Sequence, residues 1–135
     1  MILDTSAVVA VLRGEPDAED HLAAMSRADV LRISAATLVE LSVVVDARRD
    51  PVLSRRLDEL LDALDVVVEP FTATHAAVAR DAYRDYGKGS GHPAGLNLGD
   101  CFSYALASVT GEALLFTGDD FGETDLRPAL DETSA

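Results

Sequence analysis

The sequence feature that most constrains the fold is the alternation of short apolar runs with longer stretches of helical character. Strand-length apolar runs occupy residues 1–3, 30–35, 65–70 and 112–118, and the segment 119–130 offers one further short strand. Helices are expected in the intervals between the first four runs. Such alternation is typical of α/β domains, in which helices cover a largely parallel sheet. We therefore predict an α/β fold with a central, mostly parallel sheet of four to five strands flanked by helices.

Start and stop residues mark the expected helices. Gly14 and Gly87 are suited to end helices, and the residue before Pro51 resists the helical conformation. Helices are predicted at residues 5–13, 16–28, 37–49, 51–64, 72–86 and from Asn97 onward. The chain has 135 residues and shows neither internal repeats nor an interdomain linker. We therefore predict one domain spanning residues 1–135.

The chain is strongly acidic, with 24 Asp and Glu against 11 Lys and Arg and a net charge of −13. Such a surface repels nucleic-acid phosphates, so composition argues against a general DNA or RNA binder and favours a basic partner or bound cations. No apolar run approaches the length of a membrane span and no secretion signal is visible, which predicts a cytoplasmic protein without membrane contact. The single cysteine, Cys101, excludes an internal disulfide and a cysteine-based zinc site, and we place it in the core.

Several acidic residues each have a local structural explanation. Asp4 could cap a helix that starts at Thr5. Thr37 and Glu40 have the spacing of a capping box, and Asp100 would stand at the third position of a helix capped by Asn97. Asp119 and Asp120 could begin a turn. Taken singly, capping is an adequate explanation for each of these acids.

The same acids share a position relative to the predicted strands. They follow the apolar runs directly or stand near the next helix start, and the carboxyl ends of parallel strands form one edge of a sheet, where ligands bind. Carboxylates gathered there raise one another's pKa, and bound Mg²⁺ or Mn²⁺ relieves the repulsion. The three histidines, His21, His75 and His92, show no ligand spacing, and we expect His21 and His75 on solvated helix faces.

Four segments carry a family resemblance: "MILDTSAVVAVLRGEPDAE" at the start, "SAATLVEL" around Glu40, "LNLGDCFSYALA" around Asp100, and "LLFTGDDF" near the end. In this order and spacing the chain resembles PIN-domain proteins of the VapC toxin type. The glycine-rich "GKGSGHPAGLNLGDCFSYALA" is similar to one VapC subgroup in particular. The resemblance covers nearly the whole chain and implies a PIN-like fold.

The resemblance implies a metal-dependent endoribonuclease, the toxin of a toxin–antitoxin pair. Asp4 and Asp100 would be the main Mg²⁺ ligands, with Glu40 and a fourth acid completing the site, and Mn²⁺ is a plausible substitute. Many members carry Thr-x-Asp-x-Asp-Phe where this chain has the shorter "TGDDF", so the fourth acid is either Asp120, which we favour, or Asp119. Cleavage of specific tRNA, rRNA or mRNA would leave a 5′-phosphate and a 3′-hydroxyl.

Further polar residues are candidates for contacts with RNA or with the metal site. Thr5 and Ser6 could act through their hydroxyls, or simply cap a helix. Four more candidates lie in or beside the glycine-rich loop: Arg84, Lys88, His92 and Asn97. The alternative for Arg84 and for Lys88, the only lysine, is that they compensate a helix C-terminus.

The resemblance also implies partners: a VapB-type antitoxin, a second copy of the chain in a homodimer, and a toxin–antitoxin hetero-oligomer that reaches operator DNA only through the antitoxin. The segments "DAEDHLAAM" and "LVELSVVVDA" would form either an apolar groove for an antitoxin helix or part of the core.

Three other protein classes fit the sequence less well. The main alternative is a non-catalytic PIN-like module that binds RNA or protein. A receiver domain requires adjacent acids after the first strand, and here the adjacent acids come last. An aspartyl-phosphate phosphatase requires a second Asp where Ser6 stands.

Overall fold

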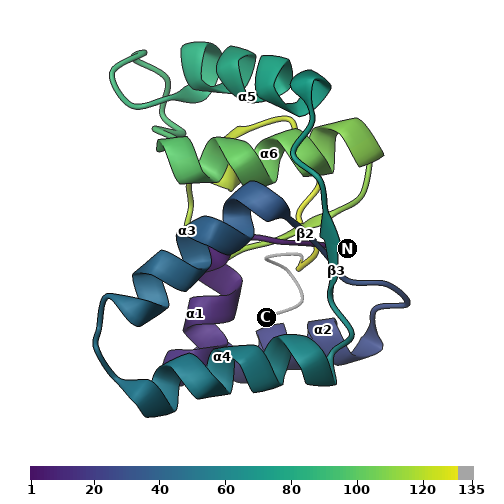
Figure 1. Ribbon diagram of the computed structural model, residues 1–135. Helices are drawn as coiled ribbons and strands as arrows, with labels where there is room; N and C mark the ends of the chain where they lie inside the picture. Colours follow the sequence, from purple (N-terminus) through teal and green to yellow (C-terminus); the bar gives the residue numbers. More distant parts are fainter. Residues whose placement is uncertain (131–135) are drawn as a thin grey trace.

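The computed structural model describes residues 1–130 and contains, within them, one sheet of four strands. The strands are short, and every pairing between them is parallel. Their order in the sheet is β3-β2-β1-β4, and their bounds are β1 (Ile2–Leu3), β2 (Arg32–Ser34), β3 (Val67–Glu69) and β4 (Leu114–Leu115). The predicted α/β class, with a parallel sheet and flanking helices, is confirmed (Figure 1).

Helices fill the intervals between the strands, as the alternation of apolar runs indicated. Their bounds in the described part of the chain are α1 (Thr5–Arg13), α2 (Ala18–Arg27), α3 (Ala35–Asp46), α4 (Pro51–Ala63), α5 (Ala73–Tyr86) and α6 (Leu98–Thr110), with a 3₁₀ helix, η1, at Phe121–Glu123. The predicted stop at Gly14 is confirmed, because this residue takes the left-handed conformation with φ of 63° that glycine adopts without strain.

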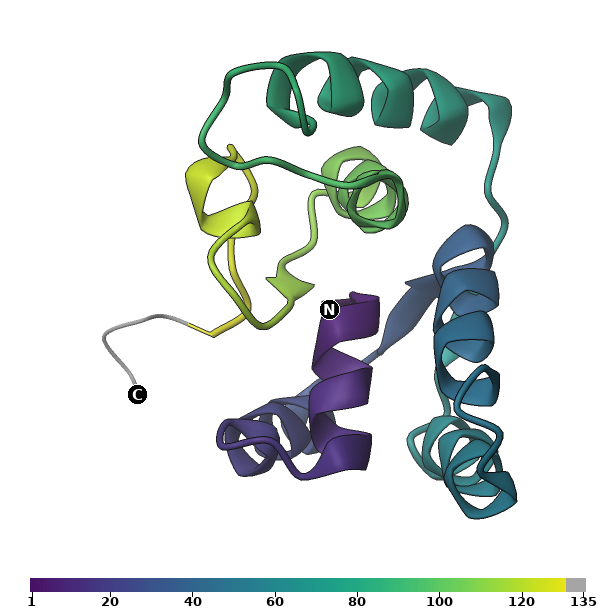
Figure 2. The ribbon, with the colours of Figure 1, turned by 90° about the vertical axis from the view of Figure 1, so that its left-hand side faces the viewer.

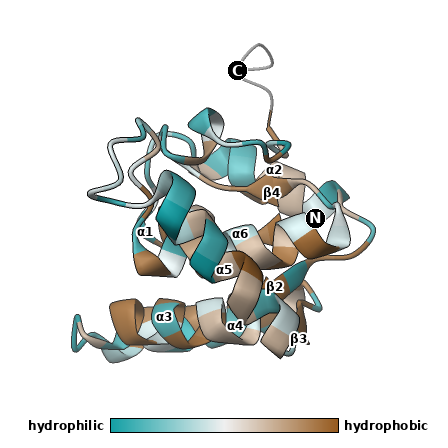
Figure 3. Ribbon diagram, turned by 90° about the horizontal axis from the view of Figure 1, so that it is seen from above, coloured by the Kyte–Doolittle hydropathy of each residue, from teal (hydrophilic) through white to brown (hydrophobic). Residues whose placement is uncertain are grey.

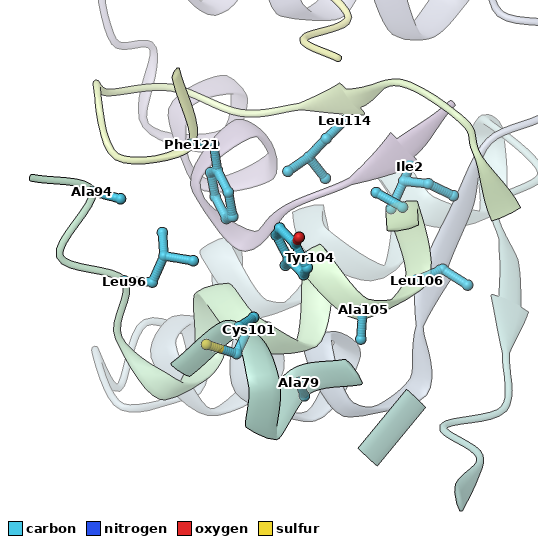
Figure 4. Packing of buried hydrophobic residues seen from close by; sticks show 12 residues of the cluster. Ile2, Ala79, Ala94, Leu96, Cys101, Tyr104, Ala105, Leu106, Leu114 and Phe121 are labelled. Atoms are coloured by element: carbon cyan, nitrogen blue, oxygen red, sulfur yellow. The ribbon is translucent and has the colours of Figure 1, made fainter. Parts of the chain in front are cut away.

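The sheet separates two hydrophobic clusters, and alternate strand residues contribute to each. Ile2 and Leu114 are register partners and pack on the side of α5 and α6, as Figure 4 shows. Leu3 and Leu115, the next pair, pack on the opposite side among α1, α2, α3 and α4. Figure 2 shows α6 almost end-on beneath α5, with α1 on the other side. Cys101 is fully buried in the first cluster, as predicted.

The strand order creates a switch point beside β1. From β1 the chain moves outward to β2 and β3, then returns to place β4 on the other side of β1. Loops that leave the carboxyl ends of β1 and β4 therefore diverge, and such a divergence is the usual place for a ligand site in an open α/β sheet. The backbone amide of Asp4, directly after β1, donates to the carbonyl of Leu115 at 3.0 Å. This bond fixes Asp4 at the switch point.

The start of α3 differs from the prediction. Ser34 is the N-cap, and its hydroxyl accepts from the amide of Ala36 at 3.2 Å. Thr37 and Glu40 therefore lie inside the helix, and the predicted capping box between them is wrong. The hydrophobic residues of α3 are not confined to one side, since Leu41 and Val45 are buried whereas Val39 and Val43 are exposed. In Figure 3, hydrophobic brown segments recur along α3, whereas α5 is largely hydrophilic teal. Glu40 extends from the second turn of α3.

The predictions for two histidines are wrong. His21 and His75 are only 1% and 7% exposed, although both were expected on solvated helix faces. His21 lies at helical spacing from buried Ala24 and Met25, and the ring of His75 meets Phe71 edge-on. A histidine on the apolar face of a helix is thus part of the packing in both cases.

Residues 119–130 were predicted to include a strand, and the structure forms η1 there instead. Beyond η1, Pro128 makes only an isolated parallel bridge to Leu114. The apolar face predicted for α6 is confirmed only in its centre, since Leu98 and Val109 are 62% and 45% exposed. Because α6 lies between α5 and the sheet, residues outside the predicted stripe are buried as well: Ser103, Tyr104 and Ala107.

Candidate active site

Asp4 is the centre of the candidate site. It stands between β1 and α1, its side chain caps α1, and the residue is only 2% exposed. Oδ2 accepts from the amide and the hydroxyl of Ser6 at 3.0 and 2.6 Å, and Oδ1 accepts from the Ser103 hydroxyl at 2.6 Å. Burial raises the pKa of Asp4 above its ordinary value, although the hydrogen bonds from Ser103 and Ser6 act in the opposite direction.

Asp100 is both a helix-capping residue and an acid of the candidate site, the two interpretations that the sequence allows. It stands at the predicted third position of α6, which Asn97 caps, and the structure adds a reciprocal bond that makes the pair a capping box: Oδ2 accepts from the amide of Asn97 at 3.0 Å, and the amide of Asp100 donates to Asn97 Oδ1 at 2.9 Å. Burial, together with the charges of three neighbouring carboxylates, raises the pKa of Asp100 to about 6 against the opposite effect of the Asn97 amide; these neighbours are Asp4, Asp120 and Glu40. The cap does not need Oδ1, so this oxygen is available to a cation.

Glu40 reaches the site from α3 and lies against the first turn of α6. The Thr5 hydroxyl donates to Glu40 Oε1 at 2.5 Å. A Cβ atom built on Gly99 would lie 1.4 Å from Glu40 Oε2, so the carboxylate occupies the space that any larger residue at position 99 would fill. Glycine at this position therefore allows Glu40 to approach Asp100.

The fourth acid comes from the turn after β4. Gly118 has φ of 93°, and both Asp119 and Asp120 are exposed. Asp120 begins η1 without a capping hydrogen bond from its side chain, and its charge is one of those that raise the pKa of Asp100. This electrostatic contact supports the preference for Asp120 over Asp119.

Two hydroxyl residues of the site were missed in the sequence. Ser103 donates to Asp4, and its oxygen lies 3.2 Å from Oγ1 of Thr37. Both residues are fully buried. The available signal was a serine one turn after Asp100, in the middle of an otherwise apolar helix.

The donor set fits a divalent cation, although its present arrangement is not that of a completed metal site. Among residues 1–130, no group of three or more His, Cys, Asp or Glu side chains is already arranged as a set of metal ligands. Hydroxyl groups hold the carboxylates of Asp4 and Glu40 instead. Burial, and to a lesser extent the charges of Asp4, Asp120 and Glu40, raise the pKa of Asp100, and a bound cation would relieve both effects. All-oxygen donors are what Mg²⁺ and Mn²⁺ prefer.

The other predicted site residues divide into two groups. Thr5 and Ser6 touch the acids, through hydrogen bonds to Glu40 and Asp4. Asn97 caps α6, as described above.

The remaining three residues lie at the end of α5 and in the glycine-rich loop. Arg84 pairs with Asp85 at 3.0 Å and Asp81 at 3.4 Å, and Lys88 is exposed. His92 packs edge-on against Tyr86 and accepts from the amide of Ala94 at 3.1 Å, so its ring holds the loop in shape.

A groove of about 530 Å³ lies between α5 and α6, beside the first turn of α6. Its floor is largely apolar, and two arginines stand among its lining residues: Phe71, Ala76, Ala79, Arg80, Tyr83, Arg84, Leu98 and Phe102. Exposed Leu98, which the sequence placed in the core, belongs to this groove.

Comparison with known proteins agrees with the fold. The PIN domain family model matches residues 1–126, and the chain belongs to this family. Ribonuclease VapC28 of Mycobacterium tuberculosis is 56% identical over 131 residues, covering 97% of this chain and 98% of that protein. Ribonuclease VapC42 of the same species is 55% identical over 129 residues, covering 96% and 98%. Within the PIN family, the chain is therefore of the VapC ribonuclease type, which confirms the resemblance described from the sequence.

Solved structures of lower identity share the fold. VapC20 of Mycobacterium tuberculosis, described as a toxin that cleaves the sarcin–ricin loop, superposes with a TM-score of 0.69 at 19% identity, covering 94% of this chain and 98% of the other. FitAcB of Neisseria gonorrhoeae gives 0.66 at 22% identity, with 94% of each chain covered. A toxin–antitoxin complex from Klebsiella pneumoniae gives 0.66 at 19% identity, covering 89% and 88%.

Proposed function

We propose that this protein is a Mg²⁺-dependent endoribonuclease and the toxin of a type II toxin–antitoxin system. The observation that carries the proposal is the placement of Asp4 and Glu40 against the N-terminal half of α6, where Asp100 stands, beside the switch point of the sheet. Asp120 follows β4, and its charge is among those that raise the pKa of Asp100. The names of its VapC relatives support ribonuclease activity. We propose a cytoplasmic location, where RNA substrates are found; no helix in residues 1–130 is long and apolar enough to cross a membrane.

Asp4 and Asp100 are the proposed main metal ligands, with Glu40 and Asp120 beside them; Mn²⁺ would be an alternative ion. A bound Mg²⁺ supplies an activated water and neutralises charge on the leaving oxygen. The chain's hydroxyls do the positioning: Ser6 and Ser103 fix both oxygens of Asp4.

Thr5 holds one oxygen of Glu40, which leaves Oε2, the oxygen next to Gly99, to accept the proton of the attacking water. The products would carry a 5′-phosphate and a 3′-hydroxyl, so the 2′-hydroxyl serves recognition only.

Substrate contacts are proposed at the glycine-rich loop and the adjoining end of α5. Lys88 is exposed there, and Arg84 stands one turn upstream at the edge of the α5–α6 groove. The net charge of −13 opposes general RNA binding, so recognition of a few structured targets in tRNA, rRNA or mRNA by shape is the favoured mode.

A VapB-type antitoxin is the proposed partner, since a similar fold occurs in a toxin–antitoxin complex from Klebsiella pneumoniae. The sequence of α2 and α3 predicts either an apolar groove for an antitoxin helix or part of the core. In the structure, these helices contribute residues both to the core and to the surface. Leu41 and Val45 are buried, whereas Val39 and Val43 are 65% and 61% exposed. The exposed valines suit an apolar partner surface, either the antitoxin or a second copy in a homodimer. Operator DNA would be reached only through the antitoxin.

The test is cleavage of total RNA by purified, antitoxin-free protein with Mg²⁺ or with EDTA, beside Asp4→Asn and Asp100→Asn variants. We expect Mg²⁺-dependent cleavage that both substitutions abolish. Equal cleavage by the variants would assign the activity to another site or to a contaminant. Absence of cleavage with any RNA would favour the alternative, a non-catalytic PIN-like module that binds RNA or protein.

A further inference from the structure

A second polar cluster lies just behind the acidic site and plays no part in the mechanism above. Its centre is Asp17, the residue before α2. Asp17 stands at the N-cap position, yet its side chain makes no capping hydrogen bond. Instead Oδ2 accepts from the hydroxyl of Thr117 and lies 2.8 Å from Nε2 of His21. The carboxylate is thus turned away from the helix and toward the chain after β4.

His21 explains why the carboxylate is turned in this direction. The side chain is buried in the face of α2 that also carries Ala24 and Met25, where an apolar residue would satisfy the packing. Its Nε2 is directed at Asp17, and its Nδ1 is buried without a hydrogen-bond partner among the described residues. One ring nitrogen of His21 is thus unsatisfied while the other contacts Asp17. Burial of a nitrogen without a hydrogen-bond partner costs free energy.

Thr117 connects this cluster to the acidic site. Its backbone amide donates to Ser6 Oγ at 3.1 Å, and Ser6 Oγ donates to Asp4 Oδ2 at 2.6 Å. Thr117 also immediately precedes the turn at Gly118 that leads to Asp120. The hydroxyl of Thr117 is therefore tied to α2 while its amide supports the hydroxyl that orients Asp4.

We propose that Asp17 is a positioning residue of the acidic site: by holding the Thr117 hydroxyl, with His21 behind it, Asp17 fixes the turn that carries Asp120 and the Ser6 hydroxyl that orients Asp4. This inference rests on the proposed metal-dependent function. Asp17 touches none of the reacting atoms and acts through Thr117. Partners of this kind, one shell behind a metal site, commonly change metal affinity or activity by about 10- to 100-fold when removed.

Thr117→Val is the main test variant, because it removes the hydroxyl without a change in charge or much change in shape. Thr117→Ser keeps the hydroxyl and is the conservative rescue. Thr110→Val is the matched control, since the Thr110 hydroxyl is bonded only locally at the C-terminal end of α6: it donates to the carbonyls of Leu106 and Ala107 and accepts from the amide of Glu112. Asp17→Asn is compared with Asp20→Asn, which removes the same charge from an exposed position of α2.

Two measurements are made on each variant. Calorimetric titration with Mn²⁺ gives metal affinity, and hydrogen exchange of the metal-free protein over residues 116–122 reports the turn. We expect Thr117→Val to bind Mn²⁺ about 10-fold more weakly and to exchange faster in this segment, Thr117→Ser to resemble the unaltered protein, and Thr110→Val to change neither. Asp17→Asn should weaken Mn²⁺ binding more than Asp20→Asn does.

The outcomes separate this inference from the function on which it rests. Unchanged exchange and Mn²⁺ affinity in Thr117→Val would overturn the positioning role. Equal weakening by Thr117→Val, Thr117→Ser and Thr110→Val would also overturn it, because the effect would then be general destabilisation. If the unaltered protein binds no Mn²⁺ and cleaves no RNA, the proposed function fails. Faster hydrogen exchange in Thr117→Val would then still show that the Thr117 hydroxyl, which donates to Asp17, stabilises this turn of the fold.

Discussion

The Cα atom of Gly99 lies directly against the carboxylate of Glu40, so a single methyl group at position 99 would overlap Oε2. The two residues come from different helices, α6 and α3, and Gly99 stands next to Asp100. A glycine in the first turn of a helix is normally a weakness, since alanine is favoured there by up to about 1 kcal/mol. At this position it provides room for an acid of the site.

Gly99→Ala should therefore reduce activity without reducing stability. The methyl group displaces Glu40 from the site, and we expect at least about a tenfold loss of RNA cleavage because catalytic groups tolerate little displacement. Thermal unfolding should occur at the same or a higher temperature. Gly122→Ala is the control, since a Cβ there meets nothing within 4 Å. Full activity in Gly99→Ala would show that Glu40 is not needed at its present place.

Ser103→Ala tests the buried hydroxyl that the sequence did not reveal. The hydrogen bond from Ser103 lowers the pKa of Asp4, so its loss raises that pKa further. We expect the acid limb of the pH–activity profile to move to higher pH, and the free energy of unfolding to fall by about 1–3 kcal/mol. The exposed Ser26→Ala, which loses only a bond to Leu22, should do neither. An unmoved acid limb would argue against the role of Ser103.

Asp100→Asn should stabilise the metal-free protein at neutral pH. Burial, with the Asp4, Asp120 and Glu40 charges, raises the pKa of Asp100 from 3.8 to about 6 in the folded state. The folded state therefore binds this proton more tightly than the unfolded state does. For this reason the free energy of unfolding falls as pH rises from 3.8 to about 6, and the whole loss is present above that range.

In a fully buried group, a pKa shift of this size would correspond to roughly 2 to 3 kcal/mol of free energy. Because Asp100 is partly solvated, we expect Asp100→Asn to raise the free energy of unfolding by only about 1 kcal/mol at pH 7. The gain should vanish below pH 4, and Mg²⁺ should stabilise the unaltered protein more than the variant. Chemical denaturation at several pH values measures these differences. Destabilisation by the substitution at pH 7 would show that the cap outweighs the repulsion.

Lys88→Ala should weaken RNA binding more than Arg84→Ala. Lys88 is exposed, whereas Arg84 already pairs with Asp81 and Asp85, which must release it before it can meet a phosphate. We expect Lys88→Ala to have a higher KM with little change in kcat. The slope of the logarithm of its RNA-binding constant against the logarithm of salt concentration should be smaller by about one. Arg55→Ala on α4, which removes an exposed arginine paired with Glu59, is the control. Equal effects of all three substitutions would indicate a purely general charge effect.

Local signals made part of the site predictable. The Asn97 cap and the place of Asp100 in the first turn of α6 are predictable because both residues lie within one helical turn, and Asp4 is predictable because it directly follows an apolar run. Their convergence follows from the parallel strands. The start of α3 was misplaced because Ser34 competes with Thr37 as a cap, and only the end of β2 decides between them.

Other parts of the site depend on packing between distant segments. Ser103 meets Asp4 across 99 positions of the chain, and Thr117 meets Asp17 across 100, so no local pattern indicates either pair. The burial of His21 was in principle visible, since Ala24 and Met25 share its face of α2. In the structure, this helical spacing determines the burial of His21, and the polar character of histidine does not.

The position of β4 in the sheet has a consequence for how this protein is made. Asp4 emerges from the ribosome first, but its amide is fixed by β4, and Asp120 arrives only after β4. Contacts between segments so far apart form late, because the whole intervening chain must be ordered first. We therefore expect the acidic site to remain incomplete in a nascent chain until residues 114–120 have left the exit tunnel.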